Sequence, residues 1–286
     1  MSLKRILALA SGGVGDDRIL AFAAQLANQH GAQAIVAPIY PDSSAEMIAL
    51  GMALGATLSD GALQSIIEVE QELQGRIDTL ARQAADEADV VFGAGDGAPR
   101  LSILLRDLRP TLALSHHAAL ADLILVAHDA IDKAPAKELL SQALLADRAP
   151  VLIARGDPDR LAGPAVIAWD GSPQAGRAMR AALPLLAMAS GIHVLQCAAG
   201  PDRMVANPDI DLLNTYLKLH GVGEGVATWV EGEDEGAALV AGAHARQAGL
   251  LVAGAWGYSR LREAVFGGAT RSFLKGIEGP SLLLAH

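Results

Sequence analysis

The stretch VIAWDGS (Val166–Ser172) decides the fold, because a counterpart of it stands near the start of the chain, ILALASG (Ile6–Gly12). Each is a short apolar run that ends in a glycine-containing turn. An alanine-rich stretch that is typical of a helix follows each turn, at Ile19–His30 and at Gln174–Ser190. The same pattern of strand, turn and helix therefore occurs twice in one chain.

The repeat extends through both halves. HAALADLILVA, from His117, matches HARQAGLLVAG, from His244, and each half closes with a proline-led apolar run, PVLIAR from Pro150 and PSLLLAH from Pro280. Strands that alternate with helices favour a parallel sheet with right-handed crossovers. We therefore expect an α/β protein of two tandem Rossmann-like domains, each a parallel five-stranded sheet flanked by helices.

The boundary between the halves is RGDPDRLAGP, Arg155–Pro164, which is rich in glycine, proline and charge. We expect a first domain over residues 1–155, a linker over 156–163 and a second domain over 164–286. The first half is the longer one, and within it Gly61–Asp89 repeats apolar side chains at three- and four-residue steps. This spacing predicts an amphipathic helix, and GAGDGAP after it is expected to be a loop.

The composition excludes several classes of protein. The chain has 286 residues, a formal net charge of −10, 51% apolar residues and only 3% aromatic residues. Non-specific binding to nucleic acid or to an acidic membrane needs basic patches, so neither is expected. No apolar run reaches the roughly 18 residues of a membrane helix, and the N-terminus does not read as a signal peptide. The single cysteine, Cys197, excludes an intrachain disulfide, fits a cytoplasmic protein and is expected to lie buried in a strand.

The second half carries a glycine-rich segment, GAWGYSRLREAVFGGATRS, which starts at Gly254. A glycine at the end of a buried strand allows positive φ and a close approach of ligand to backbone. Residues Gly267–Thr270 are expected to open the last helix, where free N–H groups and the helix dipole can hold phosphate. Asp170 ends the first strand of this half, and the carboxyl ends of parallel strands share one edge. We therefore expect Asp170 to face the same crevice as the glycine-rich segment.

The spacing Gly254-x2-Gly257-x9-Gly267 resembles that of universal stress proteins that bind ATP, and the resemblance covers nearly all of the chain. It implies a tandem universal stress protein with two domains of the adenine nucleotide alpha-hydrolase-like fold, and ATP bound in the second domain only. The residues implied to bind this cofactor are Ala168, Asp170, Gly254, Gly257, Gly267, Gly268, Ala269 and Thr270.

Two points of the resemblance stay open. Gly268 stands where the family usually has serine or threonine, so one hydroxyl is missing while the backbone N–H is kept. The family places the residue that matches Asp170 on the adenosine side. The alternative role for Asp170, or for Ser172, is to cap the helix that follows Pro173.

The first half lacks these features. Ala10 corresponds to Asp170, Ala127 to Gly254 and Ala130 to Gly257, and no glycine follows before the closing proline. We therefore predict that the first domain does not bind nucleotide in the way of the family. In the turn Ser11-Gly12-Gly13, the acidic residues come at Asp16 and Asp17, where one of them is expected to start the next helix.

The sequence favours a binding and regulatory module of the stress response over an enzyme with more than weak ATP hydrolysis. No catalytic set and no metal site is predicted, because the adjacent His116 and His117 cannot easily chelate one ion. The alternatives are a nucleotide-independent protein–protein interaction module or, less favoured, an ATP-pyrophosphatase that uses Ser11-Gly12-Gly13. PVLIAR and PSLLLAH are expected to pair as an intrachain pseudo-dimer; a homodimer of whole chains and the identity of a protein partner stay open.

Overall fold

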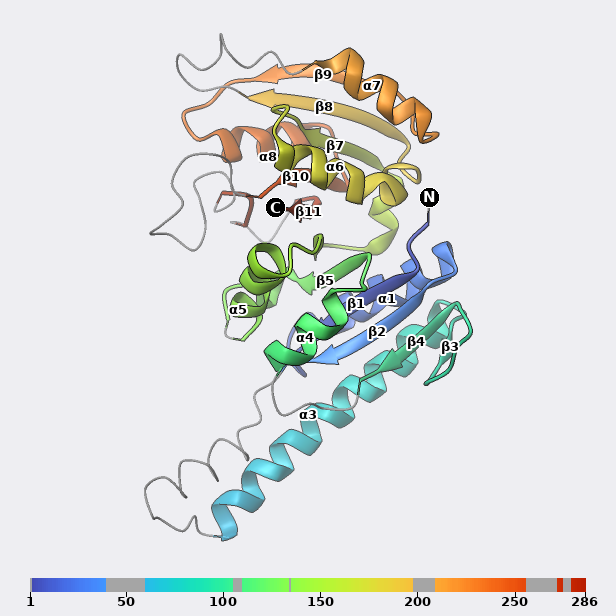
Figure 1. The fold of residues 1–286 in the computed structure, drawn as a ribbon. Coiled ribbons are helices and arrows are strands. Elements are labelled where there is room, and N and C mark those ends of the chain that lie inside the picture. The colour runs from blue at the N-terminus through green and yellow to red at the C-terminus, as the bar shows by residue number, and fades with distance from the viewer. Residues whose placement is uncertain are drawn as a thin grey trace.

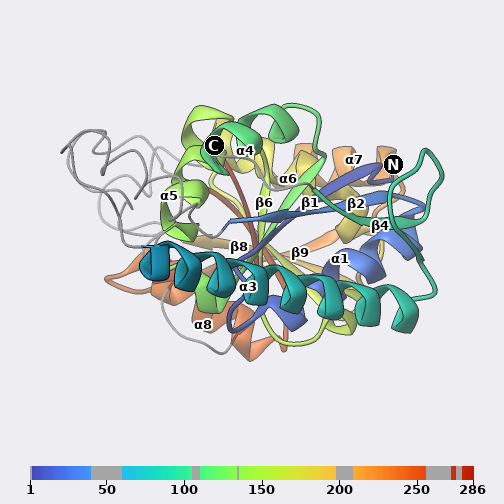
Figure 2. The same cartoon turned by 90° about the horizontal axis from the view of Figure 1, so that it is seen from below.

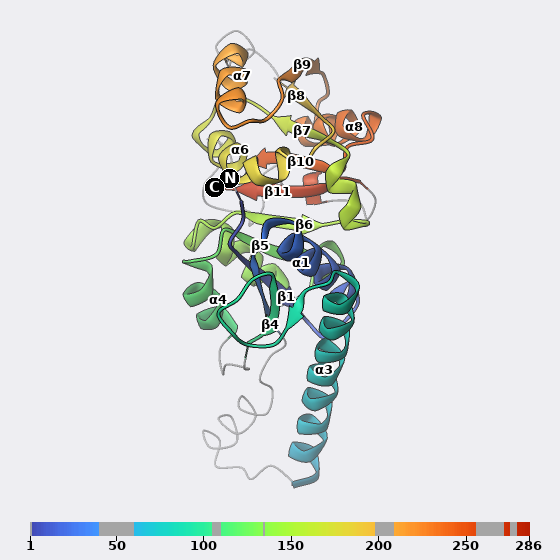
Figure 3. The same ribbon diagram turned by 90° about the vertical axis from the view of Figure 1, so that its right-hand side faces the viewer.

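A computed structural model describes residues 2–39, 60–104, 110–133, 135–197, 209–255, 272–274 and 279–286. Its strands form one sheet of 11 strands in the order β3-β4-β2-β1-β5-β6-β11-β10-β7-β8-β9, stacked from one end of the molecule to the other (Figure 3). The fold is thus α/β with a large, mainly parallel sheet, as the sequence predicts. The first half provides β1 (Arg5–Ala10), β2 (Gln33–Pro38), β3 (Val91–Phe92), β4 (Arg100–Ile103), β5 (Leu123–Ala127) and β6 (Val151–Ala154), and the second half provides β7 (Pro164–Ala168), β8 (Gly191–Cys197), β9 (Gly225–Val230), β10 (Leu250–Gly254) and β11 (Ser281–Ala285).

The two halves repeat one strand order. From the outside inward, the first half runs β4-β2-β1-β5-β6 and the second half runs β9-β8-β7-β10-β11. Every neighbouring pair within a half is parallel. The internal repeat seen in the sequence is therefore also a repeat of topology.

The closing strands β6 and β11 join the halves. They pair antiparallel, with Leu152 opposite Leu283, and this confirms the pairing expected for PVLIAR and PSLLLAH. Among the described residues the first half has six strands, one more than the five expected, whereas the second half has the expected five. The additional strand, β3, has only two residues and pairs with β4 at the outer edge. A strand this short, with Val91 exposed, shows no alternation that a sequence could reveal.

Helices cover both faces of the sheet. In Figure 2, α3 lies on one side of the sheet, and α4 and α5 lie on the other. The α-helices among the described residues are α1 (Asp16–His30), α3 (Asp60–Glu87), α4 (Pro110–Ala118), α5 (Ala136–Ser141), α6 (Pro173–Leu186), α7 (Ile210–Leu219) and α8 (Glu235–Ala245). None of these helices is long and apolar enough to cross a membrane.

Successive side chains of a strand point to opposite faces of the sheet, so the protein has one apolar core on each face. In β1, Ile6 and Ala8 belong to the core that contains residues of α1, α3, α6 and α7. Leu7 and Leu9 belong to the other core, which contains residues of α4, α5 and α8. Because both faces are buried, the strands read as continuous apolar runs, which is the pattern of parallel sheets.

Local sequence signals place the helix ends. The predicted amphipathic helix is α3, which spans Asp60–Glu87 (Figure 1), and α1 begins at Asp16 as expected. Asp234 is the N-cap of α8, and its side chain accepts a hydrogen bond from the Ala237 N–H. Cys197 ends β8 but is half-buried rather than buried, because it is the last residue of its strand.

We predict that the β6–β11 seam couples the two halves energetically. Leu152→Ala and Leu283→Ala each remove a fully buried side chain and should lower the free energy of unfolding by about 2–5 kcal/mol. Because the two residues face each other, the double variant should differ from the sum of the single variants by at least about 0.5 kcal/mol. Urea unfolding of the wild type, the two single variants and the double variant measures this difference in a double-mutant cycle.

The matched control pairs Leu152→Ala with Leu213→Ala, a buried leucine on α7. This pair should be additive within about 0.5 kcal/mol. Equal coupling in both cycles would contradict a specific contact across the seam.

Candidate functional site

The candidate site is the carboxyl edge of β7 and β10. These strands are parallel neighbours, with Leu250 opposite Ala165 and Val252 opposite Ile167. Their last residues are Ala168 and Gly254, so the structure brings Ala168, Asp170 and Gly254 to one edge of the sheet. The predicted phosphate-binding residues Gly257, Gly267, Gly268, Ala269 and Thr270 lie outside the described residues.

The turn after β7 starts helix α6. Gly171 has a left-handed backbone, with φ of 73°. The Asp170 carboxylate accepts a hydrogen bond from the backbone N–H of Ser172 at 2.9 Å, and the Ser172 hydroxyl accepts one from the N–H of Ala175 at 3.1 Å. Ser172, and not Asp170, is therefore the N-cap of α6.

The Asp170 side chain stays exposed after this bond. Its Oδ1 atom is used by Ser172, and the described residues provide no ion pair for the carboxylate. Three buried polar atoms close by in the sequence also lack a hydrogen-bond partner within the described structure: Nε1 of Trp169, Oε1 of Gln174 and Nε of Arg177. The start of α6 thus combines an exposed carboxylate with three buried polar atoms whose hydrogen-bonding capacity is unused within the described structure.

Gly254 lies at a close contact between β10 and α6. Its φ is not in the left-handed region that glycine would allow at this position. A Cβ atom at this position would lie 2.7 Å from the Ala175 nitrogen and 2.9 Å from the Gln174 Cβ. The end of β10 therefore touches the first turn of α6, and glycine is required for tight packing.

The first half has the same close contact between the end of a strand and the start of a helix, but with the glycine on the other partner. There the glycine is on the helix side, since Gly15 is the N-cap of α1 and its added Cβ would lie 3.1 Å from the Ala127 Cβ. Ala127 is the last residue of β5, the counterpart of β10. One glycine per half is sufficient to let a helix start approach the end of a strand.

The turn Ser11-Gly12-Gly13 is filled by a side chain of the protein itself. The Asp16 carboxylate accepts hydrogen bonds from the N–H of Ser11 at 3.0 Å, the N–H of Gly12 at 2.6 Å and the Ser11 hydroxyl at 3.2 Å. Asp16 is 1% exposed, and this burial raises the pKa of its carboxyl group above the ordinary value, while the two backbone bonds oppose the shift. Leu73 on α3 covers Gly12 from the outside.

Sequence reasoning found the start of α1 but missed this contact. The available signal was the glycine at the N-cap, Gly15, because a cap without a side chain leaves the acid of the first turn to satisfy backbone N–H groups. The carboxylate occupies the donors that an incoming anion would need.

No group of three or more histidine, cysteine, aspartate or glutamate side chains lies close enough to hold a metal ion within the described ranges.

Solved structures identify the fold. A universal stress protein from Archaeoglobus fulgidus DSM 4304 is similar with a TM-score of 0.66 and 13% identity, over 99% of this chain and 96% of its own. The chain has the fold of the universal stress proteins. No protein-family model matches the sequence, and no curated protein does.

Two further structures share the fold. A candidate universal stress protein from Pseudomonas aeruginosa UCBPP-PA14 has a TM-score of 0.56 and 16% identity, over 99% of this chain and 93% of its own. The cytoplasmic domain of a prokaryotic cation chloride cotransporter has a TM-score of 0.52 and 9% identity, over 100% of this chain and 95% of its own. At these identities the likeness concerns the fold alone.

We predict that Ser172→Ala lowers the free energy of unfolding by about 1 kcal/mol, because the cap of α6 is lost. Ser141→Ala is the control, since within the described part of the chain the Ser141 hydroxyl bonds back to the Lys137 carbonyl one helical turn earlier, and its effect should stay within about 0.5 kcal/mol. Chemical unfolding compares the two; equal effects would argue against the cap.

We also predict that Asp16→Asn lowers the free energy of unfolding by about 1–3 kcal/mol, because an amide cannot accept all three hydrogen bonds. Asp17→Asn makes the same change one residue later, on an exposed side chain, and should cost less than about 1 kcal/mol. If the two variants were equally stable, Asp16 would not hold the turn.

Proposed function

We propose that the chain is a tandem-type universal stress protein, with a first domain over residues 1–155, a linker over 156–163 and a second domain over 164–286. The second domain binds ATP as a regulatory ligand at the carboxyl edge of β7 and β10. The protein acts in the cytoplasm as a binding module of the stress response, with at most weak ATP hydrolysis.

The observation that carries this proposal is the chemistry at the start of α6. The exposed Asp170 carboxylate is suited to accept hydrogen bonds from ribose hydroxyls, and the unpartnered atoms of Trp169 and Gln174 lie within five residues of it in the chain. ATP would present phosphates to the backbone N–H groups of Gly267–Thr270 in the proposed arrangement. Ala168 and Gly254 form the floor on which the nucleoside lies.

One site per chain follows from the asymmetry of the halves. The turn after β1 has Ala10 where the second half has Asp170, and its free N–H groups are taken by the Asp16 carboxylate. An anion at this turn would face a buried negative charge instead of open donors. The first domain accordingly acts as a structural or regulatory partner of the second domain.

The same contact argues against an ATP-pyrophosphatase that uses Ser11-Gly12-Gly13. Such an enzyme needs the turn to receive phosphate, whereas here it receives Asp16, with Leu73 over Gly12. Product analysis for AMP and pyrophosphate tests this alternative directly.

A nucleotide-independent interaction module is the second candidate function. It is favoured by Gly254, whose packing against Gln174 and Ala175 accounts for the glycine without any ligand. Gly268 in place of a family hydroxyl points the same way. The two candidates differ in one measurable property, which is nucleotide affinity.

We predict that calorimetric titration with ATP detects one site per chain and that Asp170→Ala weakens binding roughly tenfold or more, the effect of losing a hydrogen bond to a charged group. Asp17→Ala is the control, an exposed acid in the first turn of α1, and it should leave the dissociation constant within about twofold. Absence of saturable heat at millimolar ATP would refute nucleotide binding and leave the interaction module.

A further inference from the structure

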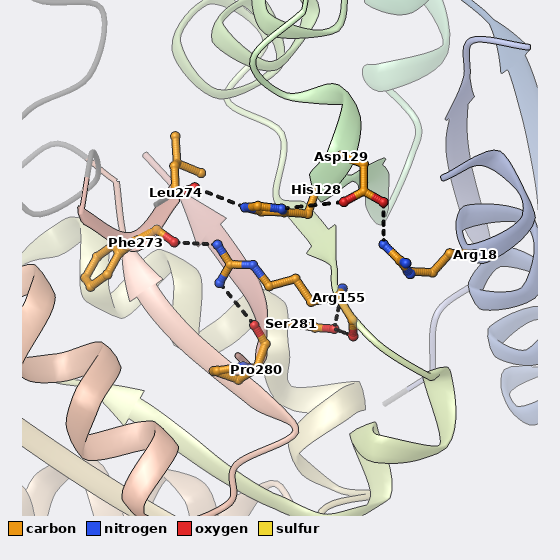
Figure 4. Close-up of polar contacts among 8 residues, drawn as sticks. All are labelled: Arg18, His128, Asp129, Arg155, Phe273, Leu274, Pro280 and Ser281. Carbon is orange, nitrogen blue, oxygen red and sulfur yellow. Dashed lines mark hydrogen bonds and ion pairs between the residues drawn. The ribbon is translucent and has the colours of Figure 1, made fainter. Parts of the chain in front are cut away.

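The seam between the halves contains a buried arginine. Arg155 directly follows β6 and is 2% exposed. Figure 4 shows its guanidinium pointing into the second half, where Nη2 donates to the Phe273 carbonyl at 2.7 Å and Nη1 to the Pro280 carbonyl at 3.3 Å. Its backbone N–H also donates to the Ser281 hydroxyl at 3.1 Å. One residue of the first half thus holds two separate backbone carbonyls of the second half.

A histidine of the first half holds the next carbonyl. His128 follows β5, is 7% exposed, and its Nε2 lies 3.0 Å from the Leu274 carbonyl oxygen, so Nε2 carries the proton. Burial and, next, the charge of Arg155 lower the pKa of the imidazole, which keeps it neutral at neutral pH. On its other side Asp129 is tied by an ion pair of 2.8 Å to Arg18 on α1 (Figure 4).

The positive charge of Arg155 is costly where it lies. Burial lowers the pKa of the guanidinium to about 10, and no carboxylate among the described residues compensates the charge. Buried charged side chains without a charged partner are rare, because burial removes their hydration. Among the described residues, the carbonyls of Phe273 and Pro280 are the groups that accept hydrogen bonds from the guanidinium, so their positions and that of Arg155 depend on each other.

The contacts of Arg155 and His128 lie just after the glycine-rich segment in the sequence. Phe273 directly follows Ser272, the last residue of the glycine-rich segment, and stands three residues after Thr270. The other end of that segment is held within the second half, where the Ala255 N–H donates to the Ala285 carbonyl at 2.8 Å. Within the second half, the Ser272 hydroxyl also donates to Asp234 at 2.5 Å. The first half therefore supplies two of the contacts that fix the carboxyl end of the segment.

We propose that Arg155 and His128 are positioning residues for the nucleotide site: they fix the backbone that follows the glycine-rich segment, and so the first half sets the affinity of the second half for ATP. This inference rests on the proposed function. It gives the first half, for which no nucleotide site is predicted, a physical role in ATP binding.

The first test requires no nucleotide. Arg155→Met should increase hydrogen–deuterium exchange at least tenfold in peptides that contain Ser272–Leu274. The matched control is Arg160→Met, because Arg160 also donates to second-half carbonyls, those of Gly279 at 3.2 Å and Ala248 at 3.4 Å, but does not touch Phe273 or Leu274. Unchanged exchange in Arg155→Met, or an equal increase in Arg160→Met, overturns the positioning role.

The second test is the ATP titration. Arg155→Met and His128→Ala should each weaken ATP binding at least tenfold, while Arg160→Met, which removes the same charge, stays within twofold. Arg155→Lys keeps the charge but not the two-pronged donor geometry, so positioning requires that it also weaken binding. Full affinity in Arg155→Lys would mean that long-range charge, and not geometry, is responsible, and the inference would be wrong.

The two tests separate this inference from the proposed function. If the wild-type chain shows no ATP binding, the proposed function fails and the claim on affinity fails with it, whatever the exchange data show. If the wild-type chain binds ATP and every variant binds equally well, with circular dichroism and melting curves that show folded protein, only the positioning role fails.

Discussion

The antiparallel ladder between β6 and β11 is the contact on which the rest of the structure depends. Each half alone would end in an exposed strand with a row of unpaired backbone groups, which invites association with other chains. Pairing the two closing strands removes both of these edges at once and buries Leu152 and Leu283 completely. Because the partners are covalently connected, the pair forms without the translational entropy cost of bringing two chains together.

The repeated halves meet the same geometric requirement with different residues. In each, the end of a strand touches the first turn of a helix, and one of the two contacting residues is glycine, Gly15 in the first half and Gly254 in the second. A glycine that a motif associates with ligand binding therefore also has a packing role. The turns after β1 and β7 differ more, since one encloses the buried acid Asp16 and the other leaves Asp170 exposed.

Much of the fold could be predicted from the sequence, because repeats, alternation and caps are local or periodic signals. The order of strands and helices, the pairing of the closing strands and the helix starts at Asp16 and Pro173 all follow from such signals. The two-residue strand β3 was missed because it is too short to show a period. The reason for Gly254 and the contacts of Arg155 depend on which segments meet in space, and no local pattern encodes that.

The seam has a consequence for how the protein is made and maintained in a cell. When two interacting modules are separate products, their ratio follows two synthesis rates and two degradation rates, and either can be in excess. Here Arg155 and Phe273 belong to one polypeptide. The first half, which provides Arg155, and the second half, which provides Phe273, are therefore always present in equal number. Synthesis also has a direction: β6 and Arg155 leave the ribosome well before β11, so the closing strand of the first half has no partner strand until β11 has been made.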